Sequence, residues 1–226
     1  MKEPKNYWDY LVRDSEGNST SLYQMGPQSH RLFLLDLLAN LGVKSILDTG
    51  CGTAPIYELI FKSQWNPVQD NTKRWDFKYK GTDYSQGMIE SCQFNFPDGD
   101  FEVQDNRKLL EKDNTWDCVL MMHVLDHLDD YEAAIKEAAR VSKKYVLIVL
   151  WRGVNYNEGA VNNLNNRSRY GKQEHEPDWE DTHLQDFAWG PLSKAFADAG
   201  LTVLQKIDGP EVNKEGKYNT LFLLEK

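Results

Sequence analysis

The chain has 226 residues, of which 40% are hydrophobic and 12% aromatic, and this is enough apolar material for the core of one α/β domain with a cap or an inserted loop. Its net charge of −9 and its pI near 5.1 argue against a nucleic-acid partner, because the surface as a whole repels polyanions. No apolar run approaches the ~20 residues that a membrane span needs, and the three cysteines show no disulfide or metal pattern, so we expect a reduced, cytoplasmic protein without a membrane partner.

The N-terminal part of the chain, residues 1–43, is expected to form an aromatic and helical cap. Aromatic side chains, among them Tyr23, precede a run of leucines that recur at helical spacing after Ser29. Gly42 is placed to end this helix, because glycine is common just after the last helical turn.

A glycine-rich turn follows the first expected strand. Residues 44–48 read as a short buried strand that ends in Asp48, and Gly50 and Gly52 come directly after it. Glycine is needed where the backbone takes a positive φ or lies against a ligand, because a Cβ would clash. A strand that runs into such a turn and then into a helix, here about residues 54–64, is how open α/β sheets hold a nucleotide-like cofactor.

The next segments alternate between strand and helix. Strands are expected at residues 79–83, 100–104, 116–122 and 144–151, and helices at residues 85–94 and from a capping box of Asp129 and Glu132 to Val141. Strands and helices that alternate at this spacing predict a doubly wound, mostly parallel sheet with helices on both faces.

The pattern breaks after the fifth strand. Residues 152–183 are rich in asparagine and charge, have no clear period, and read as an insertion on the substrate side of the sheet. A helix at residues 184–199 and two strands at residues 201–207 and 218–225 are expected to close the chain.

Two cofactors compete for the glycine turn. A dinucleotide site has the pattern G-x-G-x-x-G, whose third glycine lets the helix pack closely on the strand. In this chain the third position is Pro55, so an NAD-type oxidoreductase is only the alternative interpretation. A non-catalytic relative that binds the nucleoside without turnover also stays open.

Residues 44–151 resemble the class I S-adenosylmethionine-dependent methyltransferases. The resemblance is carried by the string ILDTGCGTAP, by two later strands that end at Asp83 and Asp105, and by an apolar strand that runs into MMHVLDHL. Ala54 stands where the family's turn usually has a third glycine. The resemblance implies a seven-stranded sheet with an antiparallel last strand, a Rossmann-like domain over residues 44–226, S-adenosylmethionine as cofactor and S-adenosylhomocysteine as product.

The resemblance also implies roles for single residues. The implied cofactor residues are Asp48, Gly50, Cys51, Gly52, Asp83, Tyr84, Asp105, Asn106, His123 and, from the cap, Tyr23. Asp48 would hold the ammonium group, Asp83 the ribose hydroxyls and Asp105 the adenine amino group. The Asn106 backbone N–H would reach a ring nitrogen, and Tyr84 would pack beside the adenosine.

His123 is the candidate for a catalytic residue. It follows the fourth strand, and imidazole suits a general base when the methyl acceptor must lose a proton. The alternative role for His123 is to pack against the cofactor or to bond a backbone carbonyl. His127 comes four residues later in the chain and is expected to be structural.

The insertion suggests what the acceptor is like. Arg152, Arg167 and Arg169 could grip a phosphate or carboxylate in bidentate fashion, and the asparagine amides suit hydroxyl groups. We therefore expect a small, polar acceptor that is sugar-like or anionic, and no set of side chains indicates a metal. The identity of the acceptor, the atom methylated and the oligomeric state are left open.

Overall fold

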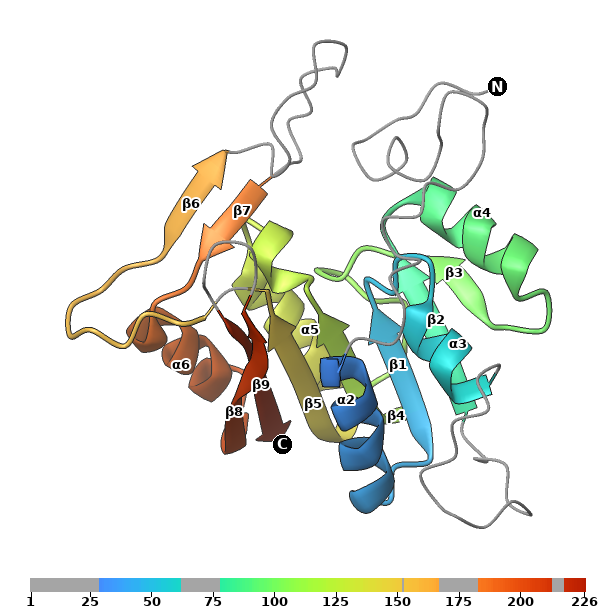
Figure 1. Cartoon of the computed structure of the whole chain (residues 1–226), viewed down its shortest axis with the longest axis horizontal. Coiled ribbons are helices and arrows are strands. Elements are labelled where there is room, and N and C mark those ends of the chain that lie inside the picture. The colour runs from blue at the N-terminus through green and yellow to red at the C-terminus, as the bar shows by residue number, and fades with distance from the viewer. Residues whose placement is uncertain (1–28, 62–77, 152, 167–182, 213–217) are drawn as a thin grey trace.

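A computed structural model of the chain describes residues 29–61, 78–151, 153–166, 183–212 and 218–226 (Figure 1). The strands of its large sheet are, from edge to edge, β3 (Phe101–Val103), β2 (Lys78–Asp83), β1 (Ser45–Thr49), β4 (Trp116–Met122), β5 (Ser142–Leu150), β9 (Tyr218–Glu225) and β8 (Thr202–Val212). Strands β1 to β5 run parallel, and β9 is antiparallel to both of its neighbours. The predicted seven-stranded, mostly parallel sheet with an antiparallel last strand is confirmed.

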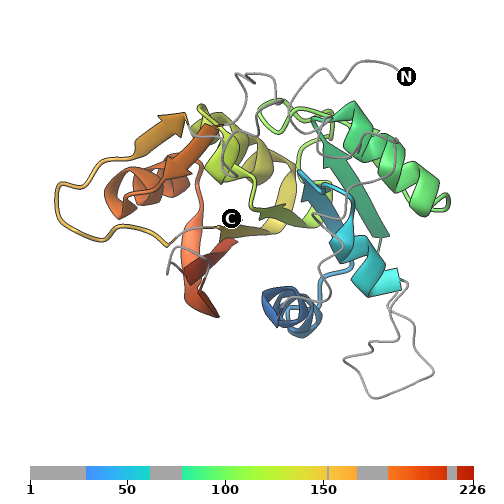
Figure 2. The ribbon, with the colours of Figure 1, turned by 45° about the horizontal axis from the view of Figure 1, so that its top comes forward.

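Helices cover both faces of this sheet. The helices of one face share a core cluster with the sheet and are α2 (Ser29–Asn40), α3 (Pro55–Phe61) and α4 (Gln86–Asn95). The other cluster contains α5 (Tyr131–Val141) and α6 (Trp189–Asp198). Figure 2 shows α2 and α5 on opposite sides of the sheet. Within the described residues, no helix has the length and apolar composition to cross a membrane.

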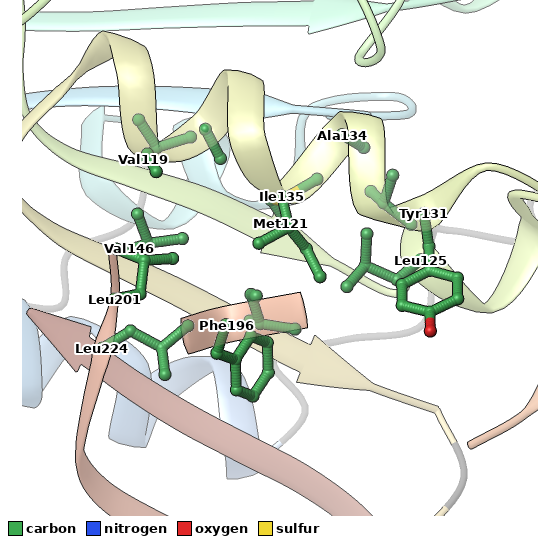
Figure 3. Close-up of a cluster of buried hydrophobic side chains, with 14 of the residues drawn as sticks. Val119, Met121, Leu125, Tyr131, Ala134, Ile135, Val146, Phe196, Leu201 and Leu224 are labelled. Atoms are coloured by element: carbon green, nitrogen blue, oxygen red, sulfur yellow. The ribbon is translucent and has the colours of Figure 1, made fainter. Parts of the chain in front are cut away.

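The packing of α5 follows from its sequence. Its buried residues recur at three- and four-residue spacing and form one apolar stripe, at Tyr131, Ala134, Ile135 and Ala138. Figure 3 shows Ile135 near Met121 of β4, and Phe196 of α6 in the same cluster. Because α5 follows β4 and leads into β5, burying this stripe against the sheet fixes the connection between the two strands.

Two predicted helix boundaries are wrong. The N-cap of α5 is Asp130, whose carboxylate accepts a hydrogen bond from the Ala133 N–H at 3.1 Å, so Asp129 does not cap this helix. The helix predicted from residue 184 begins at Trp189, because residues 183–186 form a strand instead.

That strand belongs to a small second sheet that the sequence did not indicate. β6 (Asn163–Asn166) pairs antiparallel with β7 (His183–Asp186), and asparagine-rich segments seldom read as strands because asparagine is depleted in sheets. β7 contacts the 3₁₀ turn η2 (Leu125–His127) that follows β4. Asn162, just before β6, donates to the Tyr131 hydroxyl at 2.9 Å and so ties this segment to α5.

Candidate functional site

A cavity of about 320 Å³ lies at the carboxyl ends of the parallel strands. The loops after β1, β2, β3 and β4 and the first turn of α2 supply its wall. The predicted cofactor residues within the described part of the chain all line it, and they are Asp48, Gly50, Cys51, Gly52, Asp83, Tyr84, Asp105, Asn106 and His123. Tyr23, Arg152, Arg167 and Arg169 lie outside the described residues.

The turn after β1 brings backbone rather than side chains to the cavity. Gly50 and Gly52 have φ angles of +70° and +57°. A Cβ on Gly50 would lie 2.4 Å from Cγ2 of Val124. An alanine at this position would therefore both clash with Val124 and have an unfavourable φ. Ala54, at the position of the family's third glycine, has a φ of +59°. The backbone therefore keeps the shape of the glycine turn at a cost of about 1 kcal/mol.

Asp83 joins the end of β2 to this turn. Its Oδ2 accepts a hydrogen bond from the Gly52 N–H, and its Oδ1 accepts one from the Ser85 N–H, both at 2.9 Å. A carboxylate has about four lone-pair positions, so a diol can still bind to one held in this way. Asp83 is thus fixed in orientation by the backbone groups that it also positions.

Asp48 is a buried carboxyl group with a strongly raised pKa. It is 2% exposed, and the Tyr79 hydroxyl donates to its Oδ2 at 2.7 Å. The pKa of Asp48 is raised to about 7, chiefly because the carboxyl group is buried. The hydrogen bond from Tyr79 lowers this pKa, the charge of Asp83 raises it, and the charge of Arg31 lowers it. A cation bound beside Asp48 would favour its ionised form.

Arg31, in the first turn of α2, is a cavity residue that the sequence analysis did not identify. It is 5% exposed, and its charge acts on Asp48. The sequence does contain a signal for Arg31, because it lies at helical spacing from Leu34, Leu35 and Leu38 and so shares their buried face. A charged residue on a buried face needs a partner, which indicates a site nearby. Asp48 and Arg31 line one cavity with opposite charges, as the ammonium and carboxylate groups of an amino acid require.

His123 follows β4 in a strained backbone conformation. Its φ is +56°, its N–H donates to the Val149 carbonyl at 2.8 Å, and its ring meets the Trp151 ring edge-on at 4.9 Å. Strain at a non-glycine residue beside a cavity is a reason to look for a function. His127, which was expected to be structural, also lines the cavity.

The wall of the cavity also contains an incompletely bonded amide. Asn106 is 7% exposed, and its Oδ1 has no hydrogen-bond partner among the described residues. Buried polar atoms are seldom left without a partner, so this wall fits a site that a polar ligand completes.

The loop after β3 holds an ion pair. The Arg107 side chain donates to both oxygens of Asp105 and holds the pKa of that carboxyl below its usual range. Its NH1 also reaches Oδ1 of Asp129 at 3.4 Å. Arg107 and Asp129 both line the cavity, although the sequence analysis gave neither of them a place there.

Comparisons with known proteins agree with this geometry. A family profile described as a methyltransferase domain matches residues 24–206. The ubiquinone/menaquinone biosynthesis C-methyltransferase UbiE of Desulfotalea psychrophila is 30% identical over 118 residues, which are 51% of this chain and 44% of that protein. The chain thus matches less than half the length of this curated relative.

Solved structures share the fold at low sequence identity. The putative methyltransferase of Haloferax volcanii, in complex with the Trm112 methyltransferase activator, has a TM-score of 0.62 at 19% identity over 98% of this chain and 97% of its own. The 1,6-didemethyltoxoflavin-N1-methyltransferase of Burkholderia thailandensis, with bound S-adenosylhomocysteine, has a TM-score of 0.61 at 14% identity over 91% of this chain and 81% of its own. On its matched profile the chain belongs to the methyltransferase-domain family, and its strand order and glycine turn are those of the class I S-adenosylmethionine-dependent methyltransferase fold.

Proposed function

We propose that the protein transfers a methyl group from S-adenosylmethionine to a small polar acceptor. The observation that supports this most is that Asp48 and Arg31 line the cavity that also contains Asp83, and that the charge of Arg31 acts on Asp48. Opposite charges suit the amino-acid end of the cofactor, and a fixed carboxylate suits its ribose hydroxyls. A nicotinamide cofactor carries no such amino-acid end.

The residues of the site would act chiefly by orientation. S-adenosylmethionine supplies a methyl group on a sulfonium, which is already an activated leaving group. Gly50 and Gly52 would let the backbone lie against the ligand, and Asp83 would fix its sugar, so that the methyl group points in one direction. Alignment of this kind lowers the activation barrier by several kcal/mol. His123, at the end of β4, is proposed to contact the acceptor or to take its proton.

The acceptor is proposed to enter beside η2. His127 lines the cavity from this turn, and β7 of the small second sheet packs against it. β6 and β7 would therefore lie on the acceptor side, and the acceptor-binding roles of Arg152, Arg167 and Arg169 are proposed from the sequence alone. The UbiE relative is named for ubiquinone and menaquinone biosynthesis, and the Burkholderia thailandensis relative holds 1,6-didemethyltoxoflavin. The proposal of a sugar-like or anionic acceptor therefore rests on the composition of this chain.

Methyl transfer is tested with S-adenosylmethionine labelled in its methyl group and a panel of sugars, phosphates, carboxylates and phenols. We expect label in at least one small acceptor and none in DNA or RNA. S-adenosylhomocysteine at 100 times its dissociation constant should stabilise the protein by about 2.7 kcal/mol. Stabilisation by NAD instead would favour the oxidoreductase, and binding without transfer to any acceptor would favour a nucleoside-binding protein.

Arg31→Ala is expected to weaken the binding of S-adenosylhomocysteine about 10- to 100-fold, because a charged hydrogen bond to the carboxylate is lost. The binding of 5′-methylthioadenosine, which has the same nucleoside and sulfur but no amino-acid group, should change less than about twofold. Calorimetric titration of both ligands measures the difference. Equal losses for both ligands would mean that Arg31 maintains the shape of the cavity and does not bind the carboxylate.

A further inference from the structure

An arginine lies between two carboxylates at one side of the cavity. The Asp105 carboxylate accepts the Arg107 backbone N–H at 2.9 Å and the Nε–H at 3.0 and 3.2 Å, and its Oδ2 accepts NH2 at 2.8 Å. The three side chains are between a third and two thirds exposed, with values of 35% for Asp105, 39% for Arg107 and 57% for Asp129. We refer to Asp105, Arg107 and Asp129 as the purine triad.

Arg107 leaves Asp105 with little capacity for another donor. A carboxylate offers about four lone-pair positions, and the four contacts from Arg107 are directed at both of its oxygens. An amino group of a ligand that binds to Asp105 must therefore take over a position that the guanidinium holds.

Asp129 can receive the displaced guanidinium. Arg107 NH1 is already 3.4 Å from its Oδ1, which is long for a hydrogen bond. That oxygen also accepts the Asp130 N–H at 2.8 Å, while Oδ2 has no hydrogen bond or ion pair that involves another described residue. Asp129 lies after η2 and lines the cavity next to the loop after β3, so a small rotation of the long, partly exposed Arg107 side chain changes its partner.

We infer that Arg107 moves from Asp105 to Asp129 when the purine binds, which makes Arg107 a specificity-determining residue for the cofactor. The inference rests on the proposed role of Asp105 as acceptor of the adenine amino group. Adenine has a donor at C6 that can replace the guanidinium on Asp105. Hypoxanthine has a carbonyl oxygen at C6 and its only nearby donor at N1, so it offers Asp105 no donor from the C6 position and leaves Arg107 on that carboxylate.

Two substitutions in the purine triad should then change affinity in opposite directions. Arg107→Ala frees Asp105 and should tighten S-adenosylhomocysteine binding about three- to fivefold, in line with exposed ion pairs. Asp129→Asn removes the negative charge of the second partner of the arginine and should weaken the binding about two- to threefold. In the Arg107→Ala background, Asp129→Asn should have no effect, because no guanidinium is left to move.

The experiment is a calorimetric titration of the wild-type protein, the two single variants and the double variant with S-adenosylhomocysteine and with S-inosylhomocysteine. The second ligand carries hypoxanthine in place of adenine, and its affinity should not rise in Arg107→Ala nor fall in Asp129→Asn. Lys108→Ala is the matched control, since this substitution also removes one positive charge. Lys108 is an exposed neighbour of Arg107 and has no ion pair with a described residue. It should leave both affinities within about 1.5-fold at moderate salt, because an exposed charge that makes no contact is largely screened there.

Weaker S-adenosylhomocysteine binding in Arg107→Ala would overturn the inference, because Arg107 would then contact the ligand directly. An effect of Asp129→Asn that persists in the Arg107→Ala background would overturn it as well. In either case the proposed function stands as long as the wild-type protein binds S-adenosylhomocysteine. A wild-type protein that binds neither ligand contradicts the proposed function itself.

Discussion

Asp48→Asn is expected to stabilise the empty protein at neutral pH and to weaken the binding of S-adenosylhomocysteine strongly. The folded-state pKa of Asp48 is about 7, whereas its ordinary value is 3.8. The folded protein therefore keeps a proton that the unfolded chain loses, and the free energy of unfolding falls as the pH rises between these two values. Across about three pKa units the loss amounts to as much as about 4 kcal/mol.

The asparagine variant lacks this pH dependence, because an amide does not ionise. Its advantage in stability should be close to zero at pH 4 and should grow to a few kcal/mol at pH 8. Urea unfolding at a series of pH values measures it. Binding should fall about 100-fold or more, since the ammonium group of the ligand loses its buried charged partner. Parallel pH profiles of stability for the wild-type protein and the Asp48→Asn variant would contradict the assigned cause.

Tyr79→Phe supplies the matched control for Asp48. It removes the hydroxyl that donates to Oδ2 at 2.7 Å and keeps the ring, so the pKa of Asp48 should rise further. S-adenosylhomocysteine should then bind more weakly at pH 7 and regain most of its affinity at pH 9, where Asp48 is ionised. An affinity that stays low at pH 9 would show that the ring position, and not the proton, controls binding.

Gly50→Ala is expected to destabilise the fold by about 2–5 kcal/mol and to reduce S-adenosylhomocysteine binding at least about 100-fold. The φ of +70° costs an alanine roughly 1–2 kcal/mol. The added Cβ would also lie 2.4 Å from a methyl group of Val124, and relieving such overlaps typically costs about 1–3 kcal/mol. Because the turn would move toward the cavity, binding should suffer beyond the loss of stability.

Gly42→Ala separates the two effects. Gly42 has nearly the same φ, +66°, but a Cβ there meets nothing within 4 Å. It should lower the free energy of unfolding by about 1 kcal/mol and leave ligand affinity unchanged. Thermal unfolding and calorimetry on both variants measure the contrast. Equal effects of the two substitutions would show that conformation alone, and not contact with Val124, makes Gly50 necessary.

The succession of strands along the chain and the glycine turn could be predicted because their signals are local. Apolar runs such as 116–122 end where the structure ends β4, and Gly50 and Gly52 are followed by a helix as expected. The ends of parallel strands meet at one edge of the sheet, so Asp48 and Asp83 could be placed together without knowing any contact between them. The small second sheet could not be predicted, since its strands are composed mainly of polar residues, and the contact of β7 with η2 joins distant parts of the chain.

The charges of the site depend on contacts between distant parts of the chain. No local pattern indicates that Arg31 lies beside Asp48, that Tyr79 donates to that carboxyl group, or that Arg107 lies between Asp105 and Asp129. Each of these depends on which side chains the fold brings within a few ångströms, and electrostatic energies change steeply over that range.

By itself, the sequence determined the sheet, the glycine turn and the acids at the strand ends, because backbone conformation and apolar periodicity are properties of neighbouring residues. Only the tertiary structure decided that Asp48 is buried with a pKa near 7 and that Arg31 and Arg107 supply the cations of the cavity. The physical reason is that burial and charge pairing are set by contacts between residues far apart in the chain, such as Tyr79 with Asp48, 31 positions apart, and Arg107 with Asp129, 22 positions apart.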